Sequence, residues 1–191
     1  MKNVKVAASV LLWVVVLVLA YLLYNSLREP VRYTAQVEEQ RTATIERLKN
    51  FRTAQKAFYE ATGHYTANPD SLIDMYKTGS ITEIKTIGDP YDTTVTVTYD
   101  TIEVAITETD QFTIQGDEPV DSVVFVPNSG GQMFEMEAGY YELQRVNIPV
   151  FEARAPKEVY LKGIPEKYTE KEKDVLTVGS MTDGSDAGNW E

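Results

Sequence analysis

The chain has 191 residues and carries 29 Asp and Glu against 18 Lys and Arg, which gives a formal net charge of −11 at pH 7. An acidic chain without a basic cluster lacks the positive track that nucleic acid requires, so we expect no nucleic-acid partner. Cysteine is absent from the sequence, which excludes disulfides, thiolate metal sites and cysteine nucleophiles, and His64 is the single histidine.

Residues 6–24 contain no charged side chain and form the long apolar segment of the sequence. At about 1.5 Å of rise per residue, one helix of this length crosses a hydrocarbon core of about 30 Å. A cleaved signal peptide is the alternative, but its apolar region is usually shorter and ends at small residues. This segment ends in bulky residues, among them Tyr21, Leu23 and Tyr24, so we predict a retained transmembrane helix.

The charges on either side of this segment bear on its orientation. Lys2 and Lys5 precede it, while Arg28 and Arg32 follow it, so the number of basic residues is equal on the two sides. The short head at residues 1–5 and the acidic remainder of the chain favour a cytoplasmic amino terminus. In a bacterium this predicts a single-pass protein of the inner membrane with a periplasmic carboxy-terminal domain.

Residues 25–62 are predicted to form a stalk consisting of a second long helix. Pro30 is expected to break or kink the first helix, because proline disfavours helical backbone in the residue before it. Apolar residues then recur every three or four positions, as at Leu48 and Phe51, which predicts a buried face. Residues 33–47 are more polar, so we expect them to need contact with another helix or another copy of the chain.

Residues 63–178 are predicted to form one globular domain. Gly63 is expected to end the long helix in left-handed backbone, and a short helix is expected at residues 71–77. The pattern then changes to the alternation typical of strands, and helices followed by strands indicate an α+β fold whose strands are mainly antiparallel. The charged residues 165–174 are expected to form a short exposed helix or a linker. The expected strands cover residues 93–99, 101–106, 120–126, 132–137, 147–154 and 175–178.

Residues 179–191 form a polar tail that we expect to be flexible from its composition. Trp190 in this tail either packs back onto the domain or docks a partner, since tryptophan is favoured at interfaces. Tyr140 and Tyr141 are the other candidate interaction residues, because they could line a binding surface at the end of a strand.

The remaining candidate residues do not indicate an enzyme. His64 falls in the turn that ends a helix, where we expect a polar loop residue. Glu135 and Glu137 alternate with Met136 in an expected strand, so they are predicted to share a solvent face. Gly130 lies in an expected hairpin turn and not in a phosphate loop, since no strand-to-helix junction with a lysine surrounds it. We therefore predict no catalytic residue, no cofactor and no small-molecule substrate.

Residues 52–66, RTAQKAFYEATGHYT, and residues 68–72, NPDSL, resemble the end of the long amino-terminal helix of type IV pilins and type II secretion pseudopilins. The resemblance implies a membrane helix that continues into a soluble helix and ends in an aromatic-rich turn before a short helix. The tail sequence DGSDAGNW also resembles the calcium-holding end of major pseudopilins, which implies Asp183 and Asp186 as weak ligand candidates. Two carboxylates are few for calcium, which takes about 6 to 8 oxygens, so we expect no metal.

The chain departs from pilins at its start, where no glycine precedes the apolar segment and no acidic residue lies within it. The processing site and the glutamate that orders pilin polymerisation are therefore missing. The overall pattern also resembles uncharacterised single-pass envelope proteins of Bacteroidota, some of which accompany the ExbB and ExbD proton-channel proteins.

Three hypotheses from different classes of function follow from the sequence. The first is a non-catalytic accessory subunit of an envelope complex of the ExbB/ExbD/TonB energy-transducing type, with the lipid bilayer and ExbB/ExbD-like channel subunits as partners. The alternative is a pseudopilin-like subunit of a secretion or filament system. A membrane-tethered enzyme is the third class, and the lack of a catalytic pattern among the candidate residues does not favour it.

Overall fold

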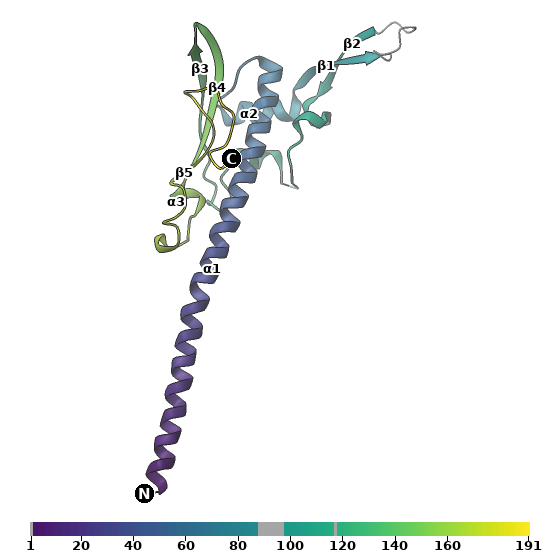
Figure 1. Ribbon diagram of the computed structural model, residues 1–191. Coiled ribbons are helices and arrows are strands. Elements are labelled where there is room, and N and C mark those ends of the chain that lie inside the picture. Colours follow the sequence, from purple (N-terminus) through teal and green to yellow (C-terminus); the bar gives the residue numbers. More distant parts are fainter. Residues whose placement is uncertain (1, 88–97, 117) are drawn as a thin grey trace, which may run out of the picture.

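A computed structural model describes residues 2–87, 98–116 and 118–191. One long helix extends from the amino terminus, and the remaining chain surrounds its carboxy-terminal end (Figure 1). Two antiparallel sheets form the β part, so the fold is α+β as the sequence predicts. By length and composition, this helix is apolar and long enough to cross a membrane.

The long helix α1, Lys2–Thr62, is unbroken and contains Pro30 in its interior. The expected break at Pro30 is therefore wrong. Proline removes one backbone hydrogen bond at a cost of about 3 kcal/mol. That cost is local, and no other proline or glycine stands near it. On one side is an apolar segment that would bond its backbone internally in lipid, and on the other a segment that packs on the domain.

The carboxy-terminal half of α1 supplies much of the core. Leu48, Phe51 and Phe58 are buried, as the spacing of apolar residues predicts, together with Ala54 and Ala57. The Phe51 ring lies 6.0 Å from that of Phe134 and 6.2 Å from that of Phe151, measured between centroids. The helix is thereby fixed against the larger sheet.

Gly63 ends α1 with a φ of 78°, as predicted, and its N–H donates to the Tyr59 carbonyl at 2.7 Å. The buried side chain of Gln55 holds the following turn, since its amide donates to the Thr66 carbonyl at 2.6 Å and accepts from the Thr66 N–H at 3.2 Å. Helix α2, Pro69–Thr78, then follows with Asn68 as its N-cap, and it begins two residues before the start expected at residue 71.

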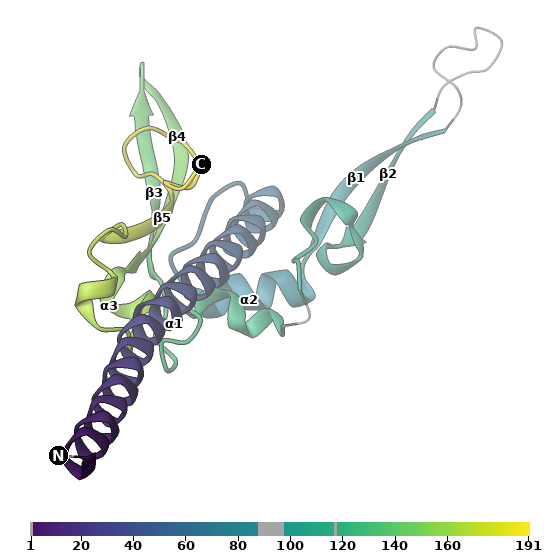
Figure 2. The same ribbon diagram turned by 60° about the horizontal axis from the view of Figure 1, so that its bottom comes forward.

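The two sheets lie on different sides of α1. Strands β1, Ser80–Ile87, and β2, Thr98–Ala105, pair antiparallel as an arm that projects from the domain (Figures 1 and 2). Strands β3, Glu135–Leu143, β4, Val146–Pro156, and β5, Val175–Gly179, form the second sheet in the order β3-β4-β5. Most of the strand expected at 93–99 lies outside the described residues.

The prediction of a strand at residues 120–126 is wrong, because the 3₁₀ helix η3 occupies Val120–Val124. Val123 and Val124 are both buried, and consecutive buried residues fit a helical turn better than a strand, whose neighbours point to opposite faces. The strand expected at 132–137 begins only at Glu135 and continues to Leu143. Those expected at 101–106, 147–154 and 175–178 correspond to β2, β4 and β5.

The stalk finds its contact within the same chain. The Tyr33 ring stacks on that of Tyr168 with centroids 4.7 Å apart, and Lys167 pairs with Glu29 at 3.1 Å. Tyr168 belongs to the 3₁₀ helix η4, Glu166–Tyr168, which follows the short helix α3, Lys157–Tyr160. The charged segment 165–174, expected to be exposed or a linker, thus covers the polar part of α1.

Candidate interaction site

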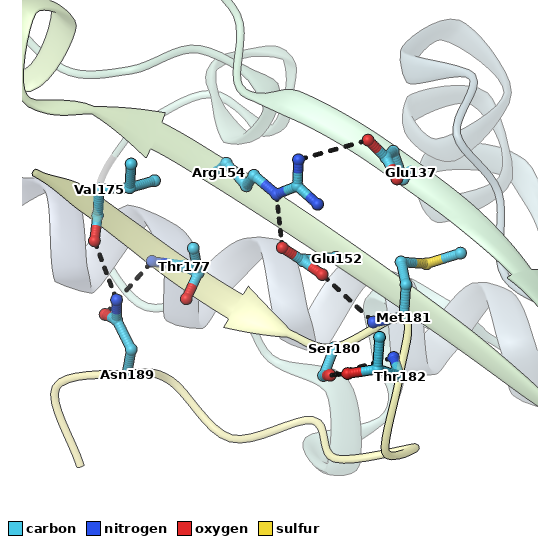
Figure 3. Close-up of polar contacts among 9 residues, drawn as sticks. All are labelled: Glu137, Glu152, Arg154, Val175, Thr177, Ser180, Met181, Thr182 and Asn189. Atoms are coloured by element: carbon cyan, nitrogen blue, oxygen red, sulfur yellow. Dashed lines mark hydrogen bonds and ion pairs between the residues drawn. The ribbon is translucent and has the colours of Figure 1, made fainter. Parts of the chain in front are cut away.

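The tail at residues 179–191 is docked, against the expectation that it would be free. Its main chain runs along the outer edge of β5, where the Gly179 N–H donates to the Ala187 carbonyl at 3.1 Å and the Asn189 N–H donates to the Thr177 carbonyl at 3.0 Å. The Asn189 side chain adds a bond to the Val175 carbonyl at 2.9 Å (Figure 3). The polar composition of the tail predicted flexibility, but composition carries no information about backbone pairing with a distant strand.

Two basic side chains of α1 hold two of the acidic side chains of the tail. Arg52 pairs with Glu191 at 2.8 Å and donates to the Asp186 carbonyl at 3.2 Å, while Lys56 pairs with the Asp186 carboxylate. The hydrogen bond from Lys56 lowers the pKa of Asp186. Lys173 donates to the Asn189 carbonyl. The tail is therefore bound by charge as well as by main-chain hydrogen bonds.

A second polar network ties the start of the tail to the sheet. Arg154 on β4 contacts Glu152 at 2.5 Å and Glu137 at 3.5 Å (Figure 3). Glu152 in turn accepts from the Met181 N–H at 3.2 Å. The hydrogen bond from Arg154 is the largest cause that lowers the pKa of Glu152. Glu135 and Glu137 are both exposed on this face, as the alternation predicts.

The three predicted interaction residues do not form one surface. The Trp190 side chain is half-buried against the core, which is the first of its two alternatives, although its Nε1–H is buried without an acceptor. Tyr140 is 64% exposed, whereas Tyr141 is half-buried. These two tyrosines are adjacent in β3, so their side chains point to opposite faces of the sheet.

The two candidate calcium ligands have other partners. Asp186 pairs with Lys56, and Asp183 accepts from the Ser185 N–H at 2.9 Å. The hydrogen bond from this backbone N–H lowers the pKa of Asp183. Within the described part of the chain, no group of three or more His, Asp or Glu residues is placed to hold a metal ion.

His64 is exposed in the turn after α1, where its Nδ1 lies 3.2 Å from the Thr62 carbonyl oxygen. Its ring meets that of Phe58 edge to face with centroids 5.6 Å apart. Gly130 adopts a φ of 79° in the turn between the paired residues Phe125 and Met133. Both residues therefore have structural roles, in a helix-ending turn and a hairpin-like turn.

Sequence reasoning missed Arg52 and Lys56, the residues that hold the tail. The available signal was their spacing of four, which places two basic side chains on one helical face in an otherwise acidic chain. Beside them is an open cavity of about 480 Å³. Its lining consists of Arg52, Thr53, Lys56, Gln111, Phe112 and Asp186.

Comparisons of this chain with protein-family models, with curated proteins and with solved structures find no match.

Proposed function

We propose that the protein is a non-catalytic, membrane-anchored subunit of a cell-envelope complex. The observation that carries this proposal is the form of α1, a single helix with an apolar exposed segment at one end and the domain packed on its other end. Residues 11–24 are exposed along their whole length, so they require lipid or protein around them. The domain presents polar surfaces and two projecting pairs of antiparallel strands, which suit contacts with other proteins.

The membrane would be the bacterial inner membrane, with residues 1–5 cytoplasmic and the domain periplasmic. The basic amino terminus and the acidity of the remaining chain support this orientation. The partner would be an ExbB/ExbD-like channel in an energy-transducing motor, a proposal supported by the general resemblance of the sequence.

A pseudopilin-like subunit is the second candidate, and a specific observation favours it. The unbroken α1 ends at Gly63 in a turn rich in aromatic rings and is followed at once by the short helix α2. The Tyr59 and Tyr65 rings stack there with centroids 5.0 Å apart. This is the architecture that the resemblance implies, although the sequence lacks the processing site and the acidic residue in the span.

Co-purification from native membranes tests the proposal. The affinity tag belongs on the amino terminus, since the tail is docked, and an unrelated single-pass protein with the same tag is the control. Recovery of ExbB/ExbD-like proteins supports the first candidate, whereas recovery of a secretin or an assembly ATPase supports the second. A chain that is found in the soluble fraction with its amino-terminal segment removed would contradict both.

A further inference from the structure

The outer edge of β5 is arranged to receive an extended peptide. β5 is the last strand of its sheet, and such an edge strand presents unpaired N–H and C=O groups to an added strand. Residues 187–189 of the tail use this edge through the bonds at Gly179 and Thr177. The pairing is short, since β5 meets the tail in one isolated bridge between Val178 and Gly188.

The charges beside this edge select an acidic peptide. Arg52 and Lys56 lie one turn apart on α1 and contact Glu191 and Asp186, and Lys173 donates to the Asn189 carbonyl of the same segment. In a chain of net charge −11, this basic group complements an acidic ligand. We call the outer edge of β5 together with Arg52 and Lys56 the tail-docking site.

The tail occupies this site imperfectly. The Trp190 Nε1–H is buried without an acceptor, which costs free energy relative to a ligand that supplies one. The cavity of about 480 Å³ next to Arg52 and Lys56 is walled by the tail only at Asp186. A peptide with a larger side chain at this position would fill more of the space.

We propose that the tail-docking site binds an acidic, extended segment of a partner protein, and that the chain's own tail covers the site until the partner displaces it. The proposal rests on the interaction role proposed above and identifies its surface. Its test uses purified protein alone, so it can fail while the membrane-anchored role stands.

The probe is a fluorescein-labelled peptide with the sequence of residues 181–191, and the readout is fluorescence polarisation with the chain in detergent micelles. A chain that ends at Ser180 should bind this peptide saturably, and the full chain should bind it at least about tenfold more weakly because its own tail competes. A full-length variant with Asp186→Lys and Glu191→Lys should also gain peptide binding, because Arg52 and Lys56 repel its tail. This variant keeps the test decisive if the shortened chain loses its fold.

Charge reversal identifies the surface. Arg52→Glu with Lys56→Glu in the shortened chain should weaken binding at least about tenfold. The matched control is Lys77→Glu on α2, since Lys77 pairs with Asp121 and not with the tail. Equal binding to the full and shortened chains, no binding to any folded variant, or no effect of the reversals at Arg52 and Lys56 would overturn the proposal. A dimer of the full chain that requires the tail would also overturn it, because the occupant would then be a second copy.

Discussion

Arg47 is a charged side chain that the fold buries, with 8% of its surface exposed. Its guanidinium group donates to the carbonyls of Ser122 and Phe125 and pairs with Glu118, and its burial lowers its pKa. These bonds satisfy backbone groups around η3 that a sheet would otherwise pair. The residue therefore joins α1 to the segment for which the sequence wrongly predicted a strand.

Arg47→Ala should lower the free energy of unfolding by about 2–3 kcal/mol, because it removes the charged hydrogen bonds that a buried guanidinium group donates to the Ser122 and Phe125 carbonyls. Arg41→Ala is the matched control on the same helix. Arg41 is 30% exposed in its side chain and makes surface pairs with Glu38 and Glu172, so its loss should cost about 0–1 kcal/mol. Urea unfolding followed by circular dichroism measures both values. Equal losses in the two variants would contradict the structural role of Arg47.

We predict that Glu152 makes part of the folding stability sensitive to acid. Its pKa is lower in the folded chain than its ordinary value of 4.5, so its stabilising contribution is full above pH 4.5 and is lost as the pH falls through the folded pKa. Glu152→Gln should therefore lower Tm at pH 7, and its difference from the wild type should shrink below pH 4.5. Thermal melts at several pH values measure this. Glu60→Gln, at an exposed position of α1, is the control and should change Tm little at pH 7.

Asp183 and Asp186 lead us to expect that calcium will leave Tm unchanged. Calcium would have to displace Lys56 from Asp186 and the Ser185 N–H from Asp183, and it would still need several more oxygens. Calorimetric titration of the full chain with calcium, repeated with Asp183→Ala, measures any binding. Saturable binding that this substitution abolishes would show the expectation to be wrong and would favour the pseudopilin-like function.

The elements that the sequence predicts well are those whose signal is local. The buried face of α1, the left-handed Gly63 and the strands β4 and β5 follow from periodicity or from a single residue type. The errors at Pro30 and at η3 arise because tertiary contacts outweigh local preference. The docked tail was missed for the same reason, since its partners Arg52 and Lys56 lie more than a hundred residues away in the sequence.

The stalk owes its order to contact with the segment that contains η4. Tyr33→Ala removes the stack on Tyr168 and should speed amide hydrogen exchange in residues 29–41, while exchange in residues 48–58 stays slow. Val31→Ala is the control, because Val31 is 71% exposed on the same part of α1. Exchange followed by mass spectrometry compares the two. An unchanged stalk in the Tyr33 variant would mean that another contact orders it.

The proposed orientation places the two ends of the chain on opposite sides of the membrane. An alkaline phosphatase fused after Glu191 should be active, and a fluorescent protein that folds only in the cytoplasm should stay dark at the same position. The matched control carries two additional lysines directly after residue 24, which should favour the reverse orientation. Active cytoplasmic and inactive periplasmic reporters in the unmodified chain would contradict the orientation.

The unbroken course of α1 through Pro30 has a mechanical consequence. About 38 residues of helix lie beyond the apolar segment, which at about 1.5 Å per residue makes a lever roughly 57 Å long. Transmembrane helices differ in tilt by tens of degrees, and a change of about 10° at the bilayer would move the far end of this lever by about 10 Å. The globular domain packs on the carboxy-terminal half of α1 through Phe51 and its neighbours, so the whole domain would move with the helix. A small change of tilt within the membrane would thus become a displacement as large as a helix diameter at the two sheets.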